Sequence, residues 1–353
     1  MAYNIRYIEG KDLNHIQEEW KALQNGEEMT IFQSYHWYQM LLEHYIPNDT
    51  KDFESFYALV ESDGHPCLIA PLWVVKKTFR FLNRKGVYML GRESFSDYLN
   101  IVYKYFDGAA FDFLLRDLSQ KFRAKYFIFE NCRENTSVYH HILDNYAIIK
   151  DTQSPCVGLN LPNSENEYQK LLSKNSRQNL RTASNRLRKD GRSLTFNYDD
   201  QEIDRTLCLA IRESKLSNAY AKVPLIKKYK YRIMNRLRYH FPYFTPISYY
   251  IGSKVMTAYD NEGNLRAFFN YGLDTDGTCV RVLAAGTDLD FARYSPGMLL
   301  MYNYILNVIE KGIIKEIDFT RGDEKYKYSL GGQLRKNHSI KFNISVPLRF
   351  GRK

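Results

Sequence analysis

A short run late in the chain, Ser295-Pro296-Gly297-Met298, has the residue types of a helix start that binds an anion. Serine suits the N-cap, and proline suits the first helical turn because its fixed φ is already helical. The free N–H groups and the dipole of a helix N-terminus both favour negative charge. Gly297 would let a ligand approach the backbone closely. The run therefore predicts a pyrophosphate site, although an ordinary buried crossover helix explains the same residues.

The surrounding sequence predicts the elements that hold this run in place. The apolar stretch Leu299–Ile309 predicts a helix, which Gly312 is placed to end. Glu316–Phe319 predicts a strand after that helix. Three strands are predicted before it: Val255–Tyr259, Leu265–Tyr271 and Thr278–Ala285.

The first half of the chain predicts the same order of elements. Its helices are expected at Gln17–Gln24, Tyr35–Tyr45 and Asp107–Phe122, and its strands at Phe56–Val60, Cys67–Val75, Val87–Leu90, Tyr98–Tyr103 and Tyr126–Glu130. Each half thus comprises a meander, a crossover helix and a further strand, which indicates an α/β (α+β) fold built from duplicated domains. The turn-forming run Thr152-Gln153-Ser154-Pro155 predicts domains of residues 1–153 and 154–353.

A basic helix is predicted from Ser173 to Asp190, with Gly191 as its stop. Leu180, Ala183 and Leu187 share one face of this helix. A neighbouring face carries the cations Lys174, Arg177, Arg181 and Arg188. Such a stripe can clamp phosphates or carboxylates, or it can simply be a solvated face. A second basic run, Lys227–Arg238, has the same two interpretations.

Composition narrows the class of partner without choosing one. The 353 residues exceed what one hydrophobic core usually serves, and the net charge of +10 favours anionic partners. We find no apolar run of about 18 residues and no signal-like apolar segment after Met1. The five cysteines form no C-x-x-C pair, so reduced thiols in the cytoplasm are expected. No metal-ligand spacing occurs, so no metal is expected.

Several motifs, taken together, resemble the GNAT acyltransferase superfamily. More narrowly, they resemble the two-domain family named for a cellulose-biosynthesis protein, which is itself similar to the Fem peptidyltransferases. The matching motifs are Phe32-Gln33-Ser34-Tyr35-His36-Trp37, Ser96-Asp97-Tyr98-Leu99, Ser154-Pro155-Cys156-Val157-Gly158-Leu159, the basic helix, Ser295-Pro296-Gly297 and Gly322-Asp323-Glu324-Lys325-Tyr326-Lys327.

The resemblance implies tandem GNAT-like domains, each a mostly antiparallel twisted sheet flanked by helices. It implies acetyl-CoA or another acyl-CoA laid along the strand near Ala285, with its pyrophosphate on the helix after Ser295. The common phosphate loop begins with Gln or Arg, which Arg293 matches, whereas Pro296 and Met298 stand where small residues are usual. The expected cofactor contacts are Leu283, Ala284, Ala285, Arg293, Ser295, Pro296, Gly297 and Met298.

Attack on a thioester requires a neutral nucleophile, a polarised carbonyl and a proton for the leaving thiolate. N–H groups after Val282 can polarise the carbonyl. Tyr326 is the expected proton donor because the ordinary tyrosine pKa of about 10 keeps it protonated. Asp318 or Asp323 is expected to take the acceptor's proton. A turn role for Asp323 and a buried aromatic role for Tyr326 remain alternatives.

The acceptor side of the site is expected to use residues from both halves. Lys327 is a candidate to steady a phosphate or a carboxylate, as are Arg177 and Arg181. Asp97, with Tyr98, is a candidate to face the acceptor from the first domain, although a strand-edge turn also explains Asp97.

The leading hypothesis is an acyl-CoA-dependent N- or O-acyltransferase, most simply an acetyltransferase, that acts on a sugar, an amino sugar or a small metabolite of polysaccharide biosynthesis. One alternative is a Fem-like transferase that uses aminoacyl-tRNA, since the basic helix suits an RNA backbone. Against it, Thr206–His240 is expected to hold only the domain's own two helices, without the long helical hairpin that Fem enzymes often use to hold tRNA. A second alternative is a non-catalytic protein that binds a polyanion.

Overall fold

The computed structural model describes residues 2–44, 53–75, 86–91, 96–221, 224 and 253–347. Its strands form one twisted sheet in the order β1-β2-β3-β4-β5-β12-β6-β11-β10-β9-β8-β7. The strands are β1 (Tyr3–Glu9), β2 (Phe53–Ser62), β3 (His65–Val75), β4 (Gly86–Met89), β5 (Tyr126–Arg133), β6 (Tyr146–Asn160), β7 (Leu194–Asn197), β8 (Lys254–Asp260), β9 (Leu265–Leu273), β10 (Cys279–Thr287), β11 (Glu316–Arg321) and β12 (Gln333–Pro347). The helices are α1 (Gln17–Leu23), α2 (Tyr35–His44), α4 (Gly108–Phe122), α5 (Ser137–Asn145), α6 (Glu165–Leu171), α7 (Lys174–Lys189), α8 (Arg205–Ala221), α10 (Pro296–Lys311) and α11 (Lys325–Ser329).

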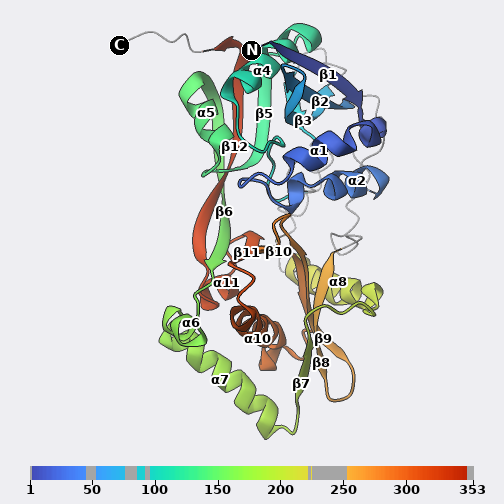
Figure 1. Cartoon of the computed structure of the whole chain (residues 1–353). Helices are drawn as coiled ribbons and strands as arrows, with labels where there is room; N and C mark the ends of the chain where they lie inside the picture. The colour runs from blue at the N-terminus through green and yellow to red at the C-terminus, as the bar shows by residue number, and fades with distance from the viewer. Residues whose placement is uncertain are drawn as a thin grey trace.

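The two halves repeat one topology, as the sequence predicts. In the first half, the antiparallel strands β1 to β4 lead through α4 to β5, which is parallel to β4. In the second half, β7 to β10 lead through α10 to β11, which is parallel to β10. The halves form the upper and lower parts of Figure 1. The expected α/β fold of a large twisted sheet flanked by helices is therefore confirmed.

Two long strands, β6 and β12, join the halves. They pair antiparallel with each other, and β12 also pairs with β5 while β6 also pairs with β11. Figure 1 shows them running together between the upper and lower parts. Ile340, Phe342 and Ile344, near the end of β12, are buried in the first-half core. The C-terminal strand therefore completes the hydrophobic core of the N-terminal half.

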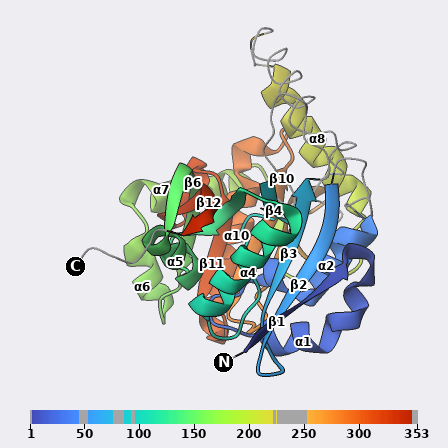
Figure 2. The same ribbon diagram turned by 90° about the horizontal axis from the view of Figure 1, so that it is seen from above.

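Helices cover the sheet in each half. In the first half, α4 lies across β2, β3 and β12, in front of those strands in Figure 2. In the second half, alternate residues of one strand face opposite sides of the sheet. Phe269 packs in the core that contains α7 and α10, whereas its neighbour Phe268 packs with Cys208 of α8. The helices α7 and α10 therefore share one face, and α8 covers the other.

Most predicted elements are present with small changes of boundary. The strand expected at Tyr98–Tyr103 is wrong, because that segment makes only an isolated bridge from Val102 to Ile69. The basic helix is present as α7, with Leu180, Ala183 and Leu187 buried. The second basic run, Lys227–Arg238, lies outside the described residues, as does much of Thr206–His240.

Candidate transferase site

Parallel strands β10 and β11 separate after three residue pairs. Their register ends at the pair Arg281 and Asp318, whereas β10 continues to Thr287 in contact with β9 on its other edge. A bulge between Val282 and Ala284 adds to the divergence. Among the described residues, the β11-facing edge of 283–287 has no strand partner. We call this opening between the two strands the wedge; it contains the predicted Leu283, Ala284 and Ala285.

The last residues of β11 border the wedge. Thr320 there adopts a left-handed backbone with φ +56°. Its hydroxyl donates to the carbonyl of Val282 at 2.9 Å, and its N–H donates to Asp318 Oδ1 at 2.6 Å. Lys327 is 2% exposed. Its ammonium group donates to the carbonyls of Arg321 at 2.7 Å and Gly322 at 3.2 Å. Lys327, predicted to steady a substrate anion, thus fixes the backbone at the end of β11.

A buried charge network forms the closed end of the wedge. Arg281 donates from Nη2 to Asp274 Oδ2 at 2.6 Å and from Nη1 to Asp318 Oδ2. Tyr98, from the first half, donates its hydroxyl to Asp318 at 2.8 Å. Burial raises the pKa of Tyr98 well above its usual value, so the phenol remains a donor. The backbone N–H of Ile31 also donates to Asp274, at 2.8 Å. The first half therefore fixes the end of a wedge that lies in the second half.

These contacts distinguish Asp318 from Asp323, the other candidate to accept the acceptor's proton. The carboxylate is 1% exposed and receives hydrogen bonds from Tyr98, Thr320 and Arg281. Hydrogen bonds from a charged guanidinium are stronger than those between neutral groups, so this carboxylate is held firmly in place. Asp323, the other expected proton acceptor, is exposed on the loop between β11 and α11. The two aspartates, which the sequence could not distinguish, thus have opposite environments.

The start of α10 lies against the end of β10. Pro296 is the first helical residue, and Ser295 holds the N-cap position in a left-handed conformation without a side-chain cap. The expected serine cap is therefore absent. A Cβ at Gly297 would lie 2.8 Å from Thr287 Oγ1, so the glycine accommodates a strand residue. Gly297 and Met298 begin the helix, where N–H groups have no intrahelical acceptor. Gly297 itself lies beside Thr287, at the end of β10.

An ion pair and hydrogen bonds connect the loop before α10 with the end of α7. Asp190 pairs with Arg293 at 2.9 Å and accepts the Tyr294 hydroxyl at 2.6 Å. Arg186 donates to the carbonyl of Arg293 at 3.1 Å. Arg293, an expected phosphate ligand, is largely exposed. Its guanidinium is paired through Nη2 with the carboxylate of Asp190.

Two more predicted residues lie around the turn after β11. Tyr326 is half-buried between the rings of Phe269 and Phe319, with ring centroids at 6.5 and 6.2 Å. Burial, and then the charge of Glu324, raise the pKa of Tyr326, which keeps it protonated. Asp97 pairs with Arg321 at 2.5 Å across the two halves. Tyr326 is thus a protonated phenol on the helix that follows the wedge.

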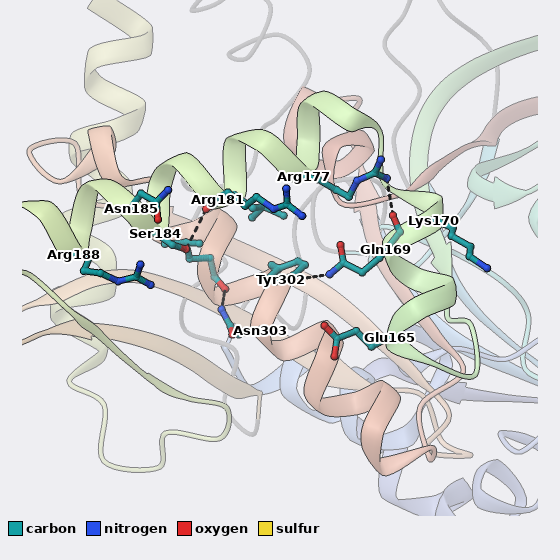
Figure 3. A pocket seen from close by; sticks show the side chains of 12 residues that line it. Glu165, Gln169, Lys170, Arg177, Arg181, Ser184, Asn185, Arg188, Tyr302 and Asn303 are labelled. Carbon is teal, nitrogen blue, oxygen red and sulfur yellow. Dashed lines mark hydrogen bonds between the residues drawn. The ribbon is translucent and has the colours of Figure 1, made fainter.

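The basic stripe of α7 borders a groove of ≈ 770 Å³ between α6, α7 and α10. Arg177 caps the end of α6, since its Nη1 donates to the carbonyls of Gln169 at 2.9 Å and Leu172 at 2.5 Å. Arg181 lines the same groove and is exposed (Figure 3). Lys174 does not line it. The structure therefore gives the two predicted substrate arginines different roles.

Sequence reasoning missed Arg281, Asp274 and Thr320. One signal was present: an arginine between Val280 and Val282 interrupts an apolar strand, and a buried arginine requires anionic partners. Those partners lie far away in sequence or in a turn, so spacing could not identify them. Among the described residues, no group of His, Cys, Asp and Glu is arranged to hold a metal. No described helix is long and apolar enough to span a membrane.

Comparison with known proteins defines the class of this site. Residues 254–328, which contain β8 to α11 and hence the wedge, match the model of the acetyltransferase (GNAT) domain. This part of the second half is therefore similar to a GNAT domain. The first half repeats the topology of the half that contains the match.

A comparison with solved structures relates the fold to that of FemX. FemX is 11% identical, with 96% of this chain and 97% of that chain covered at a TM-score of 0.56. The L-PGS from Bacillus licheniformis is 12% identical, with 96% and 93% covered at a TM-score of 0.47. A tandem GNAT protein from the clavulanic acid biosynthesis pathway is 10% identical, with 97% and 98% covered at a TM-score of 0.44. No curated protein matches the chain. At these identities, the likeness to FemX shows the fold alone.

Proposed function

We propose that this protein is an acyl-CoA-dependent N- or O-acyltransferase that transfers the acyl group directly to its acceptor. The observation that supports this most strongly is the separation of β10 from β11 after Arg281 and Asp318, next to the start of α10. An open strand edge offers donors to a thioester carbonyl and to an extended amide-bearing chain. A helix N-terminus at the end of the same edge offers donors to a pyrophosphate.

The proposed chemistry divides among three groups of residues. N–H groups at 283–285 polarise the thioester carbonyl, and those of Gly297 and Met298 bind the pyrophosphate. As the acceptor nitrogen or oxygen bonds to the acyl carbon and the C–S bond breaks, Tyr326 gives its proton to the departing sulfur. Asp323 takes the acceptor's proton, because it is exposed, whereas the lone pairs of Asp318 are already occupied. We assign Asp318, Tyr98 and Lys327 to positioning the wedge.

The acceptor and setting are also proposals. We propose a sugar, an amino sugar or another small metabolite of polysaccharide biosynthesis as the acceptor, held between domains of residues 1–153 and 154–353. Acetyl-CoA is the simplest donor for a GNAT-type site. A cytoplasmic location is consistent with the five free cysteines, four of which are buried.

Binding of CoA, acetyl-CoA and longer acyl-CoAs, measured by calorimetry, tests the proposal. Met298 is the residue to change, because a carboxylate at the third helical position favours the helix but repels a pyrophosphate. Met298→Asp is expected to abolish binding, while the matched control Met298→Asn, which loses the same packing, keeps most of it. Absence of binding by the wild type, or equal loss in both variants, would contradict the proposal.

An aminoacyl-tRNA-dependent transfer is the second candidate, and one observation favours it. Arg181 and Arg188 are exposed on one helix and form no ion pair among the described residues. Such cations suit an RNA backbone. Binding of aminoacyl-tRNA without any binding of acyl-CoA would support this candidate. Binding of RNA without transfer would leave only a polyanion-binding role.

A further inference from the structure

Two hollows adjoin along α10 and share two lining residues. The first, of ≈ 770 Å³, lies between α6, α7 and α10 (Figure 3), and the second, of ≈ 610 Å³, extends farther along α10. Glu165 and Asn303 line both hollows. We call their union the α10 groove. Its two ends differ in chemistry.

One end of the groove concentrates positive charge without internal partners. Lys170, Arg181 and Arg188 are exposed, line this end, and make no side-chain hydrogen bond or ion pair within the described part of the chain. Glu165 is the one carboxylate that lines it. Cations gathered in a concave site repel one another and focus a positive potential, which a bound anion relieves. Arginine binds phosphate oxygens through two parallel N–H groups, so a phosphate is the best-matched anion.

The other end carries no cation. Its lining consists of amides, a hydroxyl, a phenol, carboxylates and aliphatic groups, among them Tyr198, Asn307 and Glu310. Amides and carboxylates accept hydrogen bonds, and the amides and the phenol also donate them. This set suits hydroxyl groups, which both donate and accept, and it disfavours a second phosphate. A polyanion that ran the length of the groove would meet Glu165 and Glu310.

We propose that the α10 groove binds a phosphorylated saccharide, with its phosphate at Arg181 and Arg188 and its hydroxyls at Glu165 and Asn307. Every residue that lines the α10 groove belongs to residues 154–353. This ligand is therefore separate from the acceptor proposed between the two halves, and its binding requires no acyl-CoA.

The test is calorimetric titration of the full chain, without acyl-CoA, using glucose 1-phosphate and UDP-glucose as probes. The two probes distinguish a sugar phosphate from a nucleotide-linked sugar, and binding of either supports the proposal. Each of the substitutions Arg181→Gln and Arg188→Gln is expected to weaken binding at least tenfold, so the double variant should bind about a hundredfold more weakly. Lys174→Gln with Lys189→Gln removes the same charge from the same helix outside the groove, and should change affinity less than twofold.

The saccharide part of the proposed ligand is tested by a separate variant and by separate controls. Glu165→Gln with Asn307→Ala is expected to weaken the sugar probes severalfold without weakening inorganic phosphate. Equal affinity for inorganic phosphate and the sugar probes would overturn the saccharide assignment. Equal loss in the two double-charge variants, or binding of a single-stranded RNA oligonucleotide alone, would overturn the site.

The outcomes separate this inference from the proposed function. Sugar-phosphate binding without acyl-CoA binding keeps the groove and refutes the acyl transfer. Acyl-CoA binding without sugar-phosphate binding refutes the groove alone.

Discussion

Asp318→Asn tests whether the closed end of the wedge is an ionic network. The carboxylate is 1% exposed and lies between the guanidinium of Arg281 and the hydroxyl of Tyr98. The amide keeps the volume but removes one of the carboxylate charges that pair with Arg281, and it turns an NH₂ group toward one of the existing donors. Removal of one partner of a buried ion pair costs about 3–5 kcal/mol. The free energy of unfolding, from urea denaturation at pH 7, is expected to fall by about that amount.

A double-mutant cycle with Tyr98→Phe isolates the contact between the halves. The Tyr98 hydroxyl donates to a charged acceptor at 2.8 Å, so its loss is expected to cost about 1.5–3 kcal/mol. Because both changes remove the same hydrogen bond, the double variant should be less destabilised than the sum of the single variants, by about 1 kcal/mol or more. Additivity within about 0.3 kcal/mol would show that Tyr98 does not stabilise Asp318.

Asp323→Asn is the matched control, since it makes the same chemical change at an exposed carboxylate. Its effect on stability should stay within about 0.5 kcal/mol. A cost below about 1 kcal/mol for Asp318→Asn would refute the ionic network. In that case Asp318 would return as a candidate proton acceptor.

Three further predictions concern the proposed proton donor, the cofactor loop and the stability of the protein at low pH. Tyr326→Phe should lower kcat for acyl transfer by about 10²-fold with little change in the affinity for acyl-CoA, and unchanged kcat would remove Tyr326 as the proton donor. Gly297→Ala should weaken acyl-CoA binding on the order of tenfold, because the new Cβ displaces the helix start from Thr287, and adding Thr287→Ala should restore it. Burial alone would raise the pKa of Asp260, but hydrogen bonds from Asn264 and Arg266 outweigh it and lower that pKa from 3.8 to about 2. The resulting stability, about 2 kcal/mol, is present above about pH 4 and is lost as the pH falls toward 2; urea midpoints of the wild type and Asp260→Asn should therefore converge at low pH.

The sequence predicted the parts of the fold that depend on local rules. The apolar period of Leu299–Ile309, with Pro296 before it and Gly312 after it, places α10 within one residue. The Asp-Gly turn at Asp276-Gly277 likewise separates β9 from β10. The backbone of Ser295 is different: a left-handed serine is set by the packing of α10 against β10, and residue type does not reveal it.

The closed end of the wedge could not be predicted, because its partners are distant in sequence. Tyr98 and Asp318 are 220 residues apart, and the segment around Tyr98 resembles a strand but forms a loop that presents the phenol to the second half. The role of Lys327 was mispredicted for a different reason. A lysine in a motif after a strand suggests a free cation, whereas here the left-handed turn at Thr320 leaves carbonyls that require a buried donor.

The placement of this network explains why the two halves remain one unit around the wedge. The pair of Arg281 and Asp318 is the last residue pair before β10 and β11 part, so its geometry sets where the wedge begins. Tyr98 and Ile31, both from the first half, each satisfy one carboxylate of that network. In return, β12 carries Ile340 and Phe342 from the second half into the first-half core. Separating the halves would therefore leave buried charges without donors on one side and a gap in the core on the other. The first half then serves the wedge as a structural support, whether or not it binds a ligand of its own.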